Sequence, residues 1–243
     1  MIYFFMKNID FEFVESDYEK TKLDFQNKNN NILAKNIANE IKDHKEILKD
    51  VFEFLIEVFS GKLRNDNKTP MVFHSVYLTK ILYLCGEKNI NTLITGALHD
   101  VLEDTSITEN ELKNKSFLKG KEYLIDYLKI LKEDKSLSRE PDGKNLPPRY
   151  KEHIKRIINA PKEVINTEII DRFSDLDIDY LFELPKERRN FRIISKIIKT
   201  RGYVENITRN RNDINKICLD LFNYKVNKVQ KLYNIEVNVP VLS

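Results

Sequence analysis

The sequence predicts an all-α fold, and three observations support this prediction. Apolar residues recur at helical spacing in almost every long segment of the 243 residues. Turn-forming residues gather in the stretch EDKSLSREPDGKNLPPR at 133–149, which must be a loop. The terminal stretch IEVNVPVLS could form a short strand, but no second segment stands out as its partner. We therefore expect a helical protein throughout.

Each expected helix rests on its own pattern of side chains. In residues 34–59, isoleucine, leucine, valine and phenylalanine fall near one stripe of a helix. Thr108 is followed three residues later by Glu111, which is the capping-box pattern that starts a helix. The Asn-rich stretch QNKNNN at 26–31 reads as a linker. The expected helices are 34–59, 71–86, 90–103, a short helix from Thr108, 119–132, 149–158, 161–173, 187–200 and 210–232.

Composition bounds the class of protein. The 41 basic and 38 acidic residues leave a formal net charge of +3, which is too balanced to argue for a nucleic-acid partner. Cys85 and Cys218 lie in separate apolar helical patterns, which favours a reducing compartment without disulfides. The apolar run at the N-terminus is too short for a signal peptide, and no run is long enough to cross a membrane. We expect a cytoplasmic protein with no membrane partner.

The stretch ALHDVLEDTSIT at 97–108 places one histidine and three acidic residues, which can bind metal or transfer protons, at the end of an expected helix. Residues four apart lie one turn apart on one face, so His99 aligns with Glu103 and Asp100 with Asp104. His99 and Asp100 are adjacent and can converge on one ion. An imidazole with a carboxylate suits a divalent ion such as Mn²⁺, Fe²⁺ or Zn²⁺. The alternative is a hydrogen-bonded His–Asp pair that only joins two helices.

Two further candidates lie far away along the chain. His74 in TPMVFHSV belongs to the preceding expected helix and could equally be an ordinary core histidine. Asp171 ends an apolar run in EVINTEIIDRF, where burial requires a partner or a ligand. Pairing with Arg172 would satisfy it without a metal. The other two histidines, His44 and His153, lie among charged residues and are predicted to be on the surface.

Together these pieces resemble the HD-domain hydrolases of the Rel/Spo alarmone family, most of all the stand-alone small alarmone hydrolases. The matching stretches are RNDNKTPMVFHSV at 64–76, GALHDVLEDTSITENEL at 96–112, EDKSL at 133–137 and IIDRFSDL at 169–176. The resemblance covers roughly residues 45–205 and implies an HD-domain helical bundle. We place this domain at 34–205, with a helical N-terminal extension at 1–33 and a helical C-terminal extension at 206–243. It also implies a Mn²⁺-dependent hydrolase that converts guanosine tetra- or pentaphosphate, (p)ppGpp, to GDP or GTP and pyrophosphate in the stringent response.

The resemblance assigns a role to each candidate residue. The metal ligands would be His74, His99, Asp100 and Asp171, while Glu103 and Asp104 would orient or activate the attacking water. Arg64 matches the family's arginine at the purine base, and Lys135 matches a lysine that meets substrate phosphates. The family has asparagine near the nucleotide sugar where this chain has Asp175. Structural alternatives are an exposed acidic helix end for Glu103 with Asp104 and a solvated loop position for Arg64.

Three questions stay open at the level of sequence. Because of Asp175, the substrate could be another nucleotide, such as NADPH or a nucleoside phosphate. The chain could also be a catalytically silent HD module that binds a nucleotide. The basic stretch KERRNFRIISKIIKTR at 186–201 has a solvated face that covers the core as its plainest interpretation. The functional alternatives are an electrostatic funnel for a polyphosphate substrate or weak contact with RNA. The flanking extensions could mediate contacts in a homo-oligomer.

Overall fold

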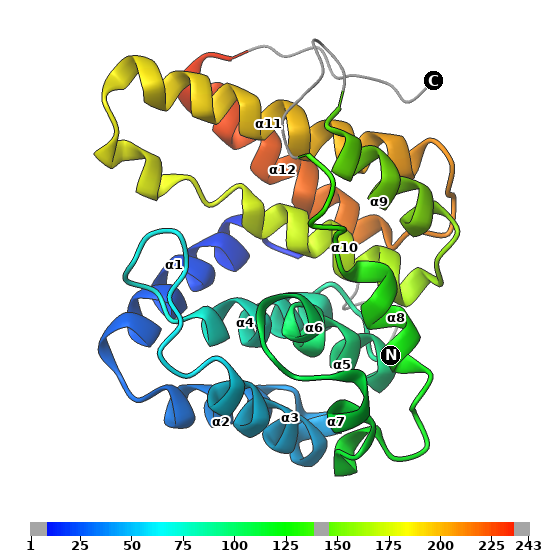
Figure 1. The fold of residues 1–243 in the computed structure, drawn as a ribbon. Coiled ribbons are helices and arrows are strands. Elements are labelled where there is room, and N and C mark those ends of the chain that lie inside the picture. The colour runs from blue at the N-terminus through cyan, green and yellow to red at the C-terminus, as the bar shows by residue number, and fades with distance from the viewer. Residues whose placement is uncertain (1–8, 139–145, 236–243) are drawn as a thin grey trace, which may run out of the picture. The chain divides into compact units, whose positions relative to one another are not determined.

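The computed structural model describes residues 9–138 and 146–235. The chain divides into two compact units, Met1–Lys129 and Ile130–Ser243, and each is considered by itself (Figure 1). In the described ranges, helices are the only regular elements apart from one isolated antiparallel bridge between Leu63 and Pro70. The all-α prediction is therefore confirmed. The strand suggested for the C-terminal stretch falls, from residue 236 onward, outside the described residues.

The first unit is built around one helix that is buried on all sides. From Val72 to Leu82 every side chain of α4 is buried, so this helix forms the centre of the unit. Helices α5, α1, α2 and α3 all pack against it or against one another. The helices of this unit are α1 (Phe11–Asn27), α2 (Asn30–Glu40), η1 (Lys42–His44), α3 (Lys45–Val58), α4 (Met71–Leu84), α5 (Ile90–Leu98), α6 (Val101–Asp104), α7 (Glu109–Lys113), η2 (Ser116–Leu118) and α8 (Leu124–Leu131), whose last two residues fall in the second unit.

Helix α1 belongs to the core of this unit. The ring of Tyr18 meets those of Phe73 and Tyr77 edge to face, with centroids 5.2 Å apart in both pairs. The Tyr77 hydroxyl donates to a carboxylate oxygen of Asp17 at 2.6 Å, and Lys80 Nζ lies 2.7 Å from the same oxygen. Burying these aromatic rings stabilises the packing of α1 on α4.

The second unit centres on α10. Helix α12 packs along α10, while α9 and α11 pack against α10 and against each other. The helices of this unit are α9 (Pro148–Ile158), α10 (Lys162–Asp175), η3 (Asp179–Glu183), α11 (Lys186–Thr208) and α12 (Lys216–Tyr233). Within the described part of the chain, no helix is long and apolar enough to span a membrane.

Two expected helices are each divided in the structure, and the stretch read as a linker is short. The helix expected at 34–59 breaks at Ile41, which is fully buried and ends α2. The helix expected at 90–103 ends at Leu98 and resumes at Val101. Only Lys28 and Asn29 separate α1 from α2. The capping box at Thr108 and Glu111 is confirmed, with both reciprocal hydrogen bonds formed. The domain limits at 33/34 and 205/206 stay a prediction.

Candidate functional site

His74 occupies the first turn of the central helix of the first unit. Pro70 immediately precedes α4. Proline suits the start of a helix because its φ is fixed near the helical value and its missing N–H would have no helical partner there. Val72 and Phe73, the two residues before His74, are both buried, and the histidine itself is only 5% exposed. A buried imidazole needs partners for its ring nitrogens, which sets this residue apart from an ordinary solvated histidine.

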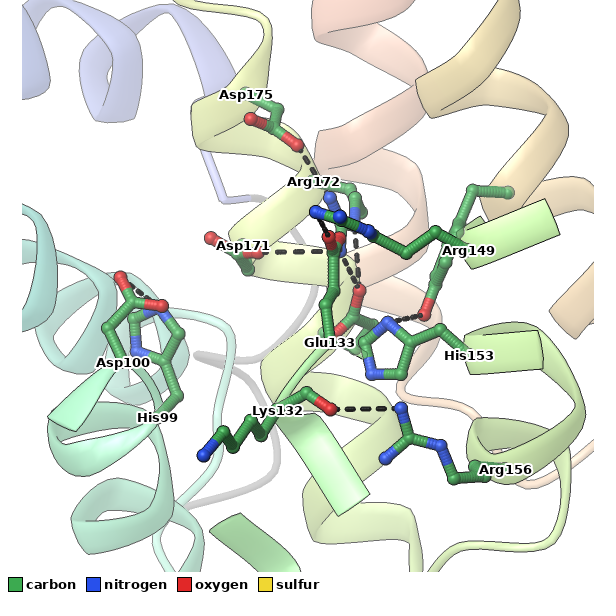
Figure 2. A network of polar contacts seen from close by, with 12 residues as sticks. His99, Asp100, Lys132, Glu133, Arg149, His153, Arg156, Asp171, Arg172 and Asp175 are labelled. Atoms are coloured by element: carbon green, nitrogen blue, oxygen red, sulfur yellow. Dashed lines mark hydrogen bonds and ion pairs between the residues drawn. The ribbon is translucent and has the colours of Figure 1, made fainter. Parts of the chain in front are cut away.

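His99 lies where α5 ends, and its ring is held by the backbone. His99 Nδ1 lies 2.8 Å from the carbonyl oxygen of Gly96, and because a carbonyl can only accept, Nδ1 carries the proton of this bond. In the neutral ring, Nε2 is then the unprotonated nitrogen with an available lone pair. The backbone at Asp100 remains helical, so its carboxylate projects beside the His99 ring (Figure 2).

The side chains of His74, His99 and Asp100 meet at a single point. The two Nε2 atoms are 3.0 Å apart, and Asp100 Oδ2 lies 3.1 Å from His99 Nε2 and 3.4 Å from His74 Nε2. Ligand atoms about 2.1 Å from a common ion and at right angles to one another would be about 3.0 Å apart. The spacing and the donor set of two imidazoles and a carboxylate therefore fit a divalent ion. The structure brings these three predicted ligands together within one unit.

Gly96 explains how the two histidines come so close. A Cβ atom at this position would lie 2.5 Å from Leu82 Cδ1 and 2.9 Å from Leu78 Cδ2, both on α4. The absence of a side chain therefore lets α5 approach α4 closely. Sequence analysis did not single out this glycine. The only available signal was a glycine inside a strong helical pattern, three residues before the His–Asp pair.

Glu103 and Asp104 follow on the short helix α6. Their backbone N–H groups both donate to the carbonyl of Asp100, at 3.1 and 2.8 Å, which places them on the turn directly after the cluster. Both side chains are partly buried rather than fully exposed. The ammonium of Lys62, from the loop before α4, donates to the Asp104 carbonyl and joins this turn to that loop.

Arg64 lies in the same loop, which is tightly built. Its N–H donates to the carbonyl of Thr69 at 2.8 Å, next to the Leu63–Pro70 bridge. Asp66 accepts from the N–H groups of Lys68 and Thr69, at 2.9 and 2.8 Å. Burial raises the pKa of Asp66, but these hydrogen bonds outweigh it, so the net pKa is lowered. The Arg64 side chain is partly buried, and its backbone is held by hydrogen bonds to Thr69 and Asn67.

Asp171 belongs to the second unit, on α10, with a side chain that is 19% exposed. Its neighbour Arg172 is buried, and the two side chains are 3.9 Å apart. Arg172 makes much closer pairs with Glu168 at 2.6 Å and with Asp175 at 2.8 Å, as Figure 2 shows for Asp175. The pairing of Asp171 with Arg172 is therefore present, but it is the longest of these three ion pairs.

Acidic groups outnumber basic ones around Arg172. Burial raises the pKa of Glu168 to about 7, with Arg172 opposing the shift and Asp171 adding to it. Burial lowers the pKa of Arg172, but the carboxylates of Glu168, Asp175 and Asp171 more than compensate and raise it. Asp175 therefore presents a carboxylate whose charge is partly offset by a permanently charged guanidinium.

Lys135 is exposed in the segment that follows α8. Its backbone carbonyl accepts a hydrogen bond from Arg149 Nη2 at 2.8 Å. Two buried side chains near this segment, Glu133 and Arg149, were not singled out by sequence analysis. Glu133 is the first residue of the EDKSL stretch, but its burial beside Arg149 and Arg172 depends on partners distant in the chain.

The prediction that His153 is a surface residue is wrong. It is fully buried, because it lies on the inner face of α9 with Ile154 and Ile157. His153 Nε2 donates to the carbonyl of Ile130 at 3.0 Å, and Nδ1 lies 2.9 Å from the Tyr203 hydroxyl. Burial and the positive charge of Arg172 lower the pKa of His153 to about 4. His44 is partly exposed and lies 2.8 Å from the carbonyl of Lys88.

Comparisons with known proteins identify the fold. No protein-family model matches the chain, and no curated protein matches it. Among solved structures, the chain is similar to a metazoan ortholog of SpoT described as hydrolysing ppGpp and acting in starvation responses. The TM-score is 0.55 at 18% identity, over 75% of this chain and 92% of that one. The protein therefore shares its all-α fold with this ppGpp-hydrolysing protein.

Proposed function

We propose that this protein is a metal-dependent phosphohydrolase that removes the 3′-pyrophosphate of (p)ppGpp, giving GDP or GTP and pyrophosphate. The observation that carries the proposal is the convergence of His74, His99 and Asp100 within 3.4 Å of one another. The fold shared with a protein described as hydrolysing ppGpp supports the choice of substrate.

We propose Asp171 as the fourth ligand and Mn²⁺ as the ion. Asp171 ends the apolar run Ile169–Ile170 on α10 and stays partly accessible, which suits a carboxylate that binds a ligand. Its position also matches the ligand of the resembled family. Two histidines and two aspartates are typical of a first-row divalent ion. A bound ion would lower the pKa of its water toward ~7 and would stabilise charge on a phosphoryl oxygen.

The remaining roles belong to the side chains around that centre. Glu103 and Asp104, one turn after the ligands, would orient the attacking water and accept its proton. Arg64 would pack its planar guanidinium against the purine base. Lys135 would bind a phosphate as a point charge. Asp175 would accept hydrogen bonds from ribose hydroxyls, with Arg172 at 2.8 Å limiting its repulsion of phosphate.

The test is pyrophosphate release from ppGpp by the Mn²⁺-loaded protein. We expect turnover by the wild type and a loss of more than about 100-fold in Asp100→Ala, since even groups behind metal ligands contribute 10- to 100-fold. Metal content of the same samples should fall with activity. Asp126→Asn is the control, because this side chain on α8 is 75% exposed and should change neither quantity. Intact ppGpp with the wild type, or an active Asp100→Ala, would refute the proposal.

A second candidate keeps the centre but changes the substrate. The motivating observation is the carboxylate of Asp175, paired with Arg172, where the resembled family has a neutral amide. The substrate would then be another nucleotide, such as NADPH or a nucleoside phosphate. A panel of nucleotides assayed for phosphate and pyrophosphate release distinguishes the two candidates. Nucleotide binding with bound metal but no turnover would instead indicate a silent HD module.

A further inference from the structure

One face of α9 binds the backbone that follows α8. Arg149, His153 and Arg156 stand at positions one turn and two turns apart, so they lie on the same side of the helix. His153 and Arg156 both bind the carbonyl of Ile130, at the C-terminal end of α8, where carbonyls lack helical partners. Arg156 also binds the carbonyl of Lys132, which follows the helix (Figure 2). These two side chains therefore cap a helix.

Arg149 acts further along the segment. Its Nε donates to the carbonyl of Leu137 and its Nη2 to that of Lys135, both at 2.8 Å. Its own N–H donates to the carbonyl of Ser138 at 3.2 Å. The guanidinium is fixed in a rigid fork, so two simultaneous bonds define both the position and the orientation of the backbone at 135–138. The Arg149 side chain is only 11% exposed, so water cannot readily replace its hydrogen bonds to the two carbonyls.

Glu133 connects the same segment to α10. Its carboxylate lies 3.9 Å from Arg149 and 3.3 Å from Arg172, and its side chain is 6% exposed (Figure 2). Arg172 in turn binds Asp175. A buried carboxylate between two guanidiniums holds both only when all three groups are in place, because removing one leaves an uncompensated charge. The segment that carries Lys135 is thereby tied to the helix end that carries Asp175.

We propose that Arg149 is a positioning residue that holds Lys135 in place for a polyphosphate nucleotide, an inference that rests on the proposed function of the site. Arg149 acts through the backbone of Lys135 and does not itself touch the substrate. Glu133 adds an ion pair to the Arg149 guanidinium, with the nearest nitrogen and oxygen atoms 3.9 Å apart. Without Arg149 the backbone at Lys135 is less restrained, so the lysine ammonium can adopt many positions. Binding must then order this segment and bear the cost in conformational entropy, which in the wild type is already borne by folding.

The experiment is a double-substitution cycle read as the dissociation constant for ppGpp in EDTA, where no hydrolysis occurs. Lys135→Ala should weaken binding about tenfold, as expected for one charge-assisted hydrogen bond. Arg149→Gln should weaken it to a similar extent. The double variant should bind no more weakly than Lys135→Ala alone, because Arg149 acts only through the lysine.

Arg156→Gln is the matched control. It removes the same kind of guanidinium-to-carbonyl bonds from the same helix, but from the end of α8 and not from Lys135. It should leave ppGpp binding unchanged. Hydrogen exchange of the peptide 133–138 adds a readout that needs no ligand, and it should accelerate in Arg149→Gln but not in Arg156→Gln.

The outcomes separate this inference from the proposed function. Additive losses in the double variant, equal weakening by Arg156→Gln, or unchanged exchange in Arg149→Gln would overturn the positioning role. A wild type that binds ppGpp with the expected cycle but releases no pyrophosphate in Mn²⁺ would refute the proposed activity and leave the role of Arg149 standing. A wild type that does not bind ppGpp would overturn the positioning role as stated.

Discussion

Gly96→Ala is the substitution that most directly tests how the candidate metal centre is built. The added methyl group would lie 2.5 Å from Leu82 Cδ1 and 2.9 Å from Leu78 Cδ2. These leucines are 0% and 2% exposed, so neither can swing into solvent. Overpacking of this kind costs about 1 to 3 kcal/mol. Replacing a helical glycine by alanine returns about 0.5 to 1 kcal/mol. The net expectation is a destabilisation of about 1 kcal/mol.

The same substitution should also weaken metal binding. Relief of the overlap requires α5 to move away from α4, and the two helices carry His99 and His74 at 3.0 Å. The Gly96 carbonyl is also the acceptor for His99 Nδ1. Disturbing a group that orients a ligand costs about 10- to 100-fold in metal affinity. Urea unfolding gives the stability, and titration of the metal-free protein with Mn²⁺ gives the affinity.

A double-substitution cycle with Leu82→Ala supplies the control. Shortening Leu82 opens the space that the new methyl group needs, so the double variant should be less destabilised than the sum of the single variants by about 1 kcal/mol. If Gly96→Ala were as stable as the wild type and bound Mn²⁺ equally well, the argument that this glycine sets the spacing of the histidines would be wrong. Strict additivity with Leu82→Ala would refute the overlap itself.

The remaining predictions concern a buried histidine and a buried ion pair. The folded-state pKa of His153 is about 4, below its ordinary 6.5, so its contribution to stability is complete above pH 6.5 and is lost as the pH falls toward 4. Between pH 7 and pH 5 the wild type should therefore lose about 2 kcal/mol more stability than His153→Gln in urea unfolding, and equal losses would contradict the assignment. In the first unit, Lys80 is buried between Asp17 and Glu40, at 2.7 and 2.8 Å. Asp17→Asn removes the buried negative charge that pairs with Lys80 and weakens the charge-assisted hydrogen bond from Tyr77, so it should cost about 2 to 4 kcal/mol. Glu40→Gln, at a side chain 55% exposed, should cost under about 1 kcal/mol, and thermal unfolding showing the reverse order would exclude this interpretation.

Local patterns were sufficient for the helical class and for part of the candidate centre. Apolar spacing reflects which face of a helix is buried, and this property is encoded by neighbours a few residues apart. The capping box at Thr108 is equally local, because Thr108 and Glu111 bond to each other. His99 and Asp100 converge for the same reason, since adjacent residues at a helix end can meet without help from the rest of the chain.

Distances between helices could not be read in the same way. Resemblance, and no local pattern, marked His74 as a ligand, because only the packing of α4 against α5 brings its Nε2 to 3.0 Å from that of His99. The helix expected at 34–59 is interrupted at Ile41, a buried residue whose ψ of 67° is not helical, and the apolar spacing did not indicate this interruption. His153 looked solvated because its neighbours in the chain are charged, yet Ile130 and Tyr203 bind it from elsewhere in the second unit.

The sequence by itself determined the helical class, the capping box at Thr108 and the adjacent histidine and aspartate, because each depends on residues within one or two turns. Tertiary structure alone decided how near α5 comes to α4, and that Arg149 binds the backbone carbonyl of Lys135. Those features depend on side-chain volumes and charges that meet across large separations in the chain. Close packing of the interior selects one arrangement of these distant side chains, and this selection cannot be read from the order of residues along the chain.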